Sequence, residues 1–210
     1  MNIGIMGGTF DPVHNGHLML AQYAYRQFGL DQVWFLPNGC PPHKSQDTIE
    51  SETYHRAQMV RLAIKDVPYF QMSSYELEQD RTSYSYETME YFHQRYPEDS
   101  FAFIIGADSL FAIESWKCPE KLLAVCDILA AYRDDKGTPE MMSQIEYLEN
   151  KYHAKIQLLE TPVMDISSHE IRKKIKDGEN ITGLIPGAVE EYIARHNLFK
   201  DEKDESAGNQ

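Results

Sequence analysis

The regular alternation of short apolar runs with amphipathic segments limits the folds open to this chain more than any other feature of the sequence. Six strand-like runs are separated by helical segments, and the run "SFAFIIGAD" (residues 100–108) is apolar enough to be buried on both faces. Strands that alternate with helices form a parallel sheet with right-handed crossovers. The sequence therefore predicts an α/β fold: a Rossmann-like, doubly wound parallel sheet with helices on both faces and a helical C-terminal part.

Two helical segments carry signals for where they begin or end. In "GHLMLAQYAYRQFG" (residues 16–29), Leu18, Ala21 and Tyr25 fall on one helical stripe, and Gly29 stands where a C-terminal cap glycine is expected. In "SETYHRAQMVRLAIKD" (residues 51–66), Ser51 is the expected N-cap. The first of these helices follows a strand and a glycine-rich turn, an arrangement that places the turn at a strand's carboxyl end, where ligands bind in such sheets.

The length and composition predict one soluble domain with a polar tail. A chain of 210 residues suffices for one well-buried core. We therefore expect a single domain over residues 1–199 and a disordered tail over residues 200–210, where the sequence is "KDEKDESAGNQ". With no signal peptide and no long apolar run, the sequence predicts a cytoplasmic protein that does not enter a membrane.

Charge and cysteine content argue against two further classes of protein. A formal net charge of −13 argues against sequence-independent binding of nucleic acid, which depends on a broad basic surface. The three cysteines include no CxxC pair, so neither a disulfide framework nor a zinc knuckle is indicated. An anionic ligand must therefore be held by a local cluster of donors.

The opening motif "GGTFDPVHNGH" (residues 7–17) has the properties of a phosphate site. Gly7 and Gly8 lack a β-carbon, so the backbone can turn tightly there and bring amides close to a ligand. The helix start offers unpaired N–H groups, and His14 and His17, three apart, can both lean toward an anion there. A plain turn and a metal-binding histidine pair are the alternatives, although no third ligand is marked by spacing.

A second motif, "ISSHEIR" (residues 166–172), lies near the C-terminus. Ser167 and Glu170 fit a capping box, which by itself would explain both residues. Ser168 and Arg172 are four apart and share a helix face, where a hydroxyl and a guanidinium could grip an anion. A surface arginine on a capped helix is the alternative, and the presence of the opening motif favours the anion site.

Taken together, these motifs resemble the HxGH nucleotidyltransferase superfamily, and within it the bacterial nicotinate mononucleotide adenylyltransferase family. The stretches "PNGCPPHKS", "DRTSYSYETM", "FIIGADSLFAIESWKCPEKL" and "GLIPGAVEEYIARHNLF" resemble further motifs of that family, in the same order. The resemblance spans residues 1 to about 199. Two departures stand out: Ser85 replaces the usual threonine of the SYT segment, and His169 follows the ISS stretch, with no role assigned.

The resemblance implies transfer of AMP from ATP to nicotinate mononucleotide, which gives deamido-NAD and pyrophosphate. Magnesium would arrive with ATP, and no metal would be held by the protein itself. The implied catalytic residues are His14, His17 and Arg172. Those implied for ATP are Gly7, Gly8, Thr9, Phe10, Gly106, Asp108, Arg133, Ile166, Ser167 and Ser168. Those implied for the nicotinate nucleotide are Lys44, Ser83, Tyr84, Ser85 and Trp116.

Several of these residues also have plain structural explanations. Asp108 could cap the helix that follows it, Lys44 could be a solvated loop lysine, and Trp116 could pack in the core. Phosphopantetheine adenylyltransferase, a regulator that binds nucleotides without catalysis, and a metal-dependent hydrolase are the alternative functions. The sequence leaves open whether the protein is a homo-oligomer, how strongly it prefers nicotinate to nicotinamide mononucleotide, and whether the PPHK loop closes as a lid.

Overall fold

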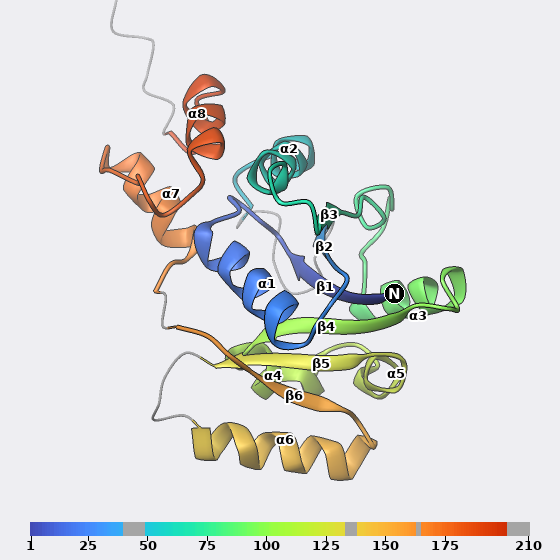
Figure 1. The fold of residues 1–210 in the computed structure, drawn as a ribbon. Helices are drawn as coiled ribbons and strands as arrows, with labels where there is room; N and C mark the ends of the chain where they lie inside the picture. Colours follow the sequence, from blue (N-terminus) through green and yellow to red (C-terminus); the bar gives the residue numbers. More distant parts are fainter. Residues whose placement is uncertain (40–48, 133–137, 163–164, 201–210) are drawn as a thin grey trace, which may run out of the picture.

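A six-stranded parallel sheet forms the centre of the protein (Figure 1). The computed structural model describes residues 1–39, 49–132, 138–162 and 165–200. The strands are β1 (Asn2–Gly8), β2 (Gln32–Pro37), β3 (Phe70–Met72), β4 (Ser100–Gly106), β5 (Asp127–Tyr132) and β6 (Ile156–Glu160). Their order across the sheet is β3-β2-β1-β4-β5-β6, and every neighbouring pair is parallel. The predicted parallel sheet is confirmed.

Helices cover both faces of this sheet. They are α1 (Asn15–Gln27), α2 (Thr53–Ile64), α3 (Ser85–Arg95), α4 (Ala107–Ala112), α5 (Pro119–Val125), α6 (Thr138–Tyr152), α7 (Ser168–Lys176) and α8 (Gly187–Arg195), with a 3₁₀ turn, η2 (Ile113–Ser115). Apolar side chains of α1, α2, α7 and α8 share one core cluster, and those of α3 to α6 share a second one. The doubly wound arrangement and the helical C-terminal part are therefore both confirmed.

The strand β4 separates these two cores. Phe101, Phe103 and Ile105 point into the cluster under α3 to α6, whereas Ala102 and Ile104 belong to the cluster under α1 and α2. Successive side chains of a strand point to opposite faces, so a strand covered on both sides needs an unbroken apolar run. The expectation from "SFAFIIGAD" is met.

The helix ends agree with one sequence prediction and overturn another. Gly29 has φ +58° directly after the C-cap of α1, a left-handed conformation that glycine adopts without strain. Ser51 is not the N-cap of α2, because that position is taken by Glu52. The Ser51 side chain is buried and donates a short hydrogen bond to the buried Asp11 carboxylate instead. A buried carboxylate needs donors more than an exposed helix end does.

The chain reverses its direction of winding between β1 and β4. β1 pairs with β2 on one side and with β4 on the other, and the helices that follow β1 and β4 lie on opposite faces. A crevice opens at such a switch point, at the carboxyl ends of the strands.

None of the described helices is long and apolar enough to cross a bilayer. The predicted tail covers residues 200–210, of which 201–210 lie outside the described residues, and the boundary at 199 stays a prediction.

Candidate active site

A cleft of about 450 Å³ lies at the carboxyl ends of β1, β2 and β4, at the predicted switch point. Its walls come from the opening motif, the start of α1, the segment before α3, the end of β4 and the turn after η2. The lining includes these predicted site residues: Gly7, Gly8, Thr9, His17, Ser83, Tyr84, Ser85, Gly106, Asp108 and Trp116. The structure thus brings most of the expected ligand-binding residues into one cavity.

The glycine pair serves packing at the end of β1. Both glycines are still in the strand, opposite Leu36 and Pro37 of β2, so the expectation that they make the turn themselves is wrong. A β-carbon at Gly7 would lie 3.2 Å from the Phe103 ring, and one at Gly8 would lie 3.0 Å from the Phe10 ring. The sharp change of direction falls on Phe10, at φ +52°. Glycine is needed because aromatic rings occupy the side-chain space.

His14 and His17 lie together at the start of α1. His14 is the N-cap residue and is 6% exposed, while His17, at the N3 position, lines the cleft. Their rings stack with centroids 3.7 Å apart and an interplanar angle of 26°. A β-carbon at Gly16 would lie 3.0 Å from His14 Nδ1, so the absence of a side chain at Gly16 leaves room for the His14 imidazole. Gly16 was not among the predicted site residues, although it stands between the two histidines.

The hydrogen bonding of His17 fixes what its outer nitrogen can do. The backbone N–H of His14 donates to His17 Nδ1 at 3.2 Å. An atom that accepts this bond carries no proton, so the proton of the imidazole resides on Nε2. His17 therefore offers a hydrogen-bond donor, which suits a phosphate oxygen and does not suit a metal ion.

Arg56 of α2 ties the opening motif to the end of β2. It is only 1% exposed, and its Nη1 donates to the carbonyl oxygens of Thr9 at 2.8 Å and Asn38 at 2.7 Å. Its Nη2 donates to the Gly39 carbonyl at 3.3 Å. The sequence analysis missed Arg56. A detectable signal existed, because a charged residue at this position shares the buried helix face with residues three and four further on.

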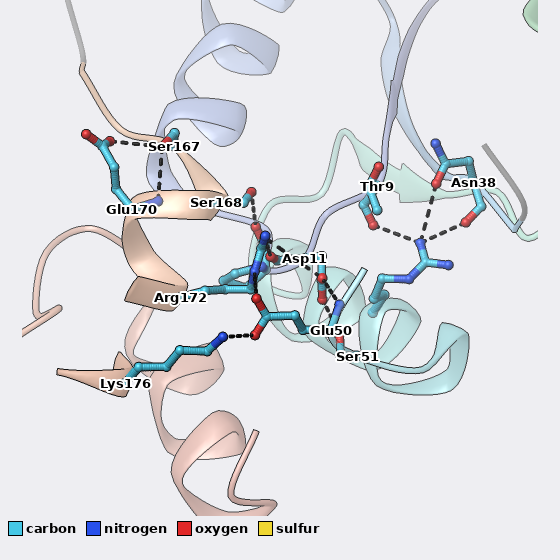
Figure 2. A network of polar contacts seen from close by, with 12 residues as sticks. Thr9, Asp11, Asn38, Glu50, Ser51, Ser167, Ser168, Glu170, Arg172 and Lys176 are labelled. Atoms are coloured by element: carbon cyan, nitrogen blue, oxygen red, sulfur yellow. Dashed lines mark hydrogen bonds and ion pairs between the residues drawn. The ribbon is translucent and has the colours of Figure 1, made fainter. Parts of the chain in front are cut away.

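Arg172 and Ser168 contact the opening motif, as Figure 2 shows. Ser168 Oγ donates to the Pro12 carbonyl at 2.9 Å, and Arg172 Nη1 donates to the Asp11 carbonyl at 2.7 Å. Arg172 Nε also donates to Glu50 Oε1 at 3.1 Å. The two residues share a helix face as predicted, and they join α7 to the loop after β1. Neither of them lines the cleft.

Glu50 is held between two cations at this junction. Arg172 lies on one of its carboxylate oxygens and Lys176 on the other, at 3.1 and 2.9 Å. Desolvation raises the pKa of Glu50, but hydrogen bonds from Lys176 and Arg172 outweigh it and hold the pKa below its ordinary value. Glu50 thus links the segment before α2 to two cations of α7.

The start of α7 bears out half of the expected capping box. Ser167 is the N-cap, and its Oγ accepts from the Glu170 backbone N–H at 3.2 Å. The Glu170 carboxylate accepts from the Ser167 hydroxyl at 2.9 Å and does not reach the N-cap backbone. Ile166, before the cap, is half-buried against the first core cluster. These residues fix where α7 begins and anchor its start to the first core cluster.

The end of β4 presents Gly106 and Asp108 to the cleft. Gly106 is the N-cap of α4, and no side chain caps this helix. The alternative that Asp108 is a helix cap is therefore wrong. Asp108 is exposed in the first turn of α4 and lines the cleft, where its carboxylate can accept hydrogen bonds from a ligand.

The far end of the cleft is built by the segment before α3 and by Trp116. Tyr84 is the N-cap residue of α3, and Ser85 begins the helix. Ser83 is 9% exposed, and its Oγ has no hydrogen-bond partner in the described structure. Trp116 meets the Phe103 ring edge-on, with centroids 6.2 Å apart, and is half-buried in the cleft wall. The tryptophan thus belongs to the core cluster and to the cavity at once.

Glu76 lines the same end of the cleft and was not predicted from the sequence. It is 6% exposed, and its Oε1 accepts from Thr88 Oγ1 at 2.7 Å. Burial raises the pKa of the Glu76 carboxyl to about 7, and the hydrogen bond from Thr88 acts in the opposite direction. No local pattern marks this residue in the sequence, since its burial arises from contacts distant along the chain.

Two predicted residues and the question of metal ligands remain. Lys44 and Arg133 lie outside the described residues. Across the part of the chain that the structure describes, no three His, Cys, Asp or Glu side chains are grouped so as to hold a metal ion.

Comparison with known proteins assigns this chain to a class of enzyme. The family model described as cytidylyltransferase-like matches residues 5–174. Two solved structures of the nicotinic acid mononucleotide adenylyltransferase of Plasmodium falciparum share the fold. The complex with NaAD has TM-score 0.76 and 23% identity, covering 94% of this chain and 97% of that one. The complex with APC has TM-score 0.74 and 22% identity, covering 94% and 96%. The family model thus places the chain among the cytidylyltransferase-like enzymes.

More similar relatives narrow the class. A protein of Lachnoclostridium phytofermentans named "Probable nicotinate-nucleotide adenylyltransferase" is 42% identical over 94% of this chain and 98% of its own length. A protein of the same name from Clostridium novyi is 40% identical, with the same coverage of both chains. The chain belongs to the nicotinate-nucleotide adenylyltransferase family within the cytidylyltransferase-like enzymes. The family resemblance found in the sequence is confirmed.

Proposed function

We propose that this nicotinate-nucleotide adenylyltransferase joins ATP and nicotinate mononucleotide within the cleft between β1 and β4, releasing deamido-NAD and pyrophosphate. One observation carries the proposal: a single cavity of about 450 Å³ has His17 and Gly8 in its wall and also Ser83 and Trp116. Donors suited to phosphate and a flat aromatic surface are thus available to one ligand.

The reaction needs no covalent enzyme intermediate. A phosphate oxygen of nicotinate mononucleotide attacks the α-phosphorus of ATP, and the bond from that phosphorus to the oxygen bridging to the β-phosphate breaks. The new phosphorus–oxygen bond completes the dinucleotide, and pyrophosphate leaves with the electron pair of the broken bond. Both reactants are anions, so the protein lowers the barrier by aligning them and by stabilising charge.

The two histidines act on the phosphates in this proposal. His17 Nε2 carries its proton and donates to the phosphate chain, and His14 stabilises charge that builds on the α-phosphate. The backbone amides of Thr9 and Phe10 contribute at the end of β1, where Gly7 and Gly8 allow close approach of a ligand. The helix start adds its partial positive charge to the same region.

Arg172 and Ser168 hold the leaving pyrophosphate. In the absence of ATP, Arg172 donates to the Asp11 carbonyl and to Glu50, and Ser168 donates to the Pro12 carbonyl. ATP would therefore have to replace Glu50 at the guanidinium. An exchange of carboxylate for phosphate keeps the charge-assisted hydrogen bond, so its cost is small.

The nucleosides take the two ends of the cleft. Gly106 lets the adenosine approach the end of β4, and Asp108 accepts from its ribose hydroxyls. Ile166 and Ser167 flank the nucleotide from the start of α7. The pyridine ring stacks on Trp116, and its carboxylate lies near the backbone amides of Tyr84 and Ser85. Arg133 and Lys44 are proposed on resemblance alone, for ATP and for a substrate phosphate.

Magnesium enters this proposal with ATP. The residues at the phosphate end offer protons from imidazole, hydroxyl, guanidinium and backbone N–H groups, which suit phosphate oxygens, whereas Mg²⁺ takes oxygen ligands and keeps several waters. The ion, when bound, neutralises part of the phosphate charge. The chain itself contributes the donors that orient the phosphates around it.

Release of pyrophosphate from Mg–ATP tests the function. Nicotinate mononucleotide, nicotinamide mononucleotide and phosphopantetheine are offered separately at matched concentrations. Fast release is expected with nicotinate mononucleotide and slow release with the others. Fast release with phosphopantetheine would overturn the assignment, and no release with any acceptor despite measured ATP binding would favour a regulator.

A further inference from the structure

Glu76 is a buried acid in the wall of the cleft that the proposed mechanism does not use. It lies in the segment between β3 and α3, and its backbone packs against the end of β2. A β-carbon at Gly39 would come within 2.6 Å of the Glu76 carbonyl oxygen. Its side chain is 6% exposed and turns toward α3, where Thr88 Oγ1 lies 2.7 Å from Oε1. The backbone of Glu76 is therefore held beside the end of β2, and its carboxyl group is held by α3.

Among the residues that the structure describes, no opposite charge compensates Glu76. The shift of its pKa to about 7 has two causes, burial and the weaker, opposite effect of the Thr88 hydrogen bond. The other titratable groups around the cleft are His17 on α1, Asp108 on α4, Lys117 after η2 and Tyr84 before α3.

Within the described part of the chain, the helix and the segment packed beside Glu76 offer it no cation either. Glu87 on α3 is paired with Arg81 at 2.5 Å, and Tyr75 stacks on Tyr91 with ring centroids 4.1 Å apart. The arginine nearest in sequence is thus already held by another carboxylate. Near neutral pH, Glu76 can therefore exist as a neutral acid that donates a hydrogen bond or as an anion.

Another polar group at this end of the cleft, the Ser83 hydroxyl, lacks a hydrogen-bond partner in the described structure. Ser83 is 9% exposed, lines the cleft, and its Oγ has no hydrogen-bond partner in the described structure. A buried hydroxyl without a partner is costly, which indicates that a polar atom of a ligand belongs beside it. Ser83 and Glu76 thus both place polar groups in the wall of the same cleft.

We propose that Glu76 distinguishes the pyridine carboxylate from a carboxamide by its protonation: the neutral acid admits nicotinate mononucleotide, and the ionised acid repels it. The inference rests on the proposed stacking of the pyridine ring at Trp116. Two carboxylates held close together in one cleft cannot both stay ionised at low cost, so nicotinate mononucleotide binds together with a proton taken from solvent. A carboxamide carries no charge and does not depend on that proton.

The test compares Glu76→Gln with the unaltered enzyme. Glutamine has the shape of the neutral acid and cannot ionise. We measure kcat/KM for nicotinate mononucleotide from about pH 6 to about pH 8.5 and take the ratio of variant to unaltered enzyme at each pH. All other residues and the substrate are the same in both proteins, so the ratio isolates the effect of the change at position 76.

A ratio near one at low pH that rises about tenfold by the upper end of the range is expected, because only the unaltered enzyme gains a repelling charge. The same ratio for nicotinamide mononucleotide, measured as substrate or as competitor, stays flat. A flat ratio for nicotinate mononucleotide would overturn the inference and leave the function intact. If neither protein used nicotinate mononucleotide, the function and the inference would fail together.

Thr88→Val gives a second test that does not change the acid. Loss of the Thr88 hydroxyl removes the hydrogen bond that lowers the pKa of Glu76. The pH at which kcat/KM for nicotinate mononucleotide falls should then move upward. An unchanged or lower midpoint would contradict the inference, and this holds even if Glu76→Gln does not fold.

Discussion

The two ends of the cleft are built in opposite ways. Next to the phosphate end, Arg56 and Arg172, neither of which lines the cleft, are bound by acceptors of the protein itself, among them the carbonyl oxygens of Thr9 and Asp11. At the pyridine end, Ser83 has no partner in the described structure and Glu76 accepts one hydrogen bond. The first end is cross-linked before any substrate arrives, and the second leaves polar groups to be satisfied by a ligand.

This difference fits two separate tasks: alignment of the phosphates at one end of the cleft and selection of the pyridine nucleotide at the other. Polyanionic phosphates need several donors held in place, and a cross-linked framework provides that without reorganisation during the reaction. The pyridine substituent needs selection, which relies on buried polar groups that only the correct partner satisfies. Changes at the phosphate end should therefore affect kcat or stability, and changes at the pyridine end should affect the use of one substrate.

The largest effect is expected from His14→Ala. Loss of a donor to the transition-state charge should lower kcat by roughly 10²- to 10³-fold with both substrates saturating. The measurement is steady-state pyrophosphate release. The exposed His93 on α3 gives the matched control, His93→Ala, with kcat unchanged. Near-native kcat in His14→Ala would remove this residue from the phosphate end.

Arg56→Met should mainly lower stability. The variant leaves the carbonyl oxygens of Thr9, Asn38 and Gly39 without their buried donor, which costs about 3 kcal/mol of unfolding free energy. Urea unfolding followed by circular dichroism gives the value. Arg61→Met, at an exposed position of the same helix, should change it by less than about 0.5 kcal/mol. Equal losses in both variants would refute a framework role for Arg56.

A smaller and more selective effect is expected from Trp116→Ala. Loss of ring stacking should raise KM for nicotinate mononucleotide about tenfold and leave KM for ATP within about twofold. The exposed Phe111 on α4 provides the control variant Phe111→Ala, with both KM values unchanged. Equal increases in KM for both substrates in Trp116→Ala would contradict the assignment of Trp116 to the pyridine end of the cleft.

The smallest effect is expected from Glu50→Gln. Because the pKa of Glu50 is lowered in the folded protein, its stabilisation is present above the ordinary value of 4.5 and is lost as pH falls through the lowered value. The half-exposed ion pairs limit this contribution to less than about 1 kcal/mol at neutral pH. Thermal unfolding at pH 7 and near pH 3 should show the difference shrink on acidification. A difference that grows on acidification would contradict the assignment.

Much of the fold could be predicted because local and global signals agree. The apolar run of β4 and the cap glycine after α1 follow from local rules that the packing does not override. Ser51 illustrates where such rules fail, since a distant buried carboxylate, Asp11, draws its hydroxyl away from the helix start. Tertiary partners far apart in the sequence decide such positions.

The residues of the candidate site also differ in whether local sequence patterns or distant contacts determine their positions. His14, His17, Ser168 and Arg172 belong to short contiguous motifs, so their types and spacing point to phosphate. Glu76 has no such pattern, because its burial depends on Gly39 and Thr88, which the chain brings close only when the sheet forms. Arg56 lies between these cases. Its position on a buried helix face can be recognised from the sequence pattern, but Arg56 was not among the predicted site residues.

A crystal structure with bound deamido-NAD tests the two-ended cleft most directly. The account predicts the pyridine ring on Trp116, the adenosine beside Gly106 and Asp108, and the bridging phosphates at the start of α1 near His17. A dinucleotide bound in the reverse direction, or in a place outside the cleft between β1 and β4, would contradict it.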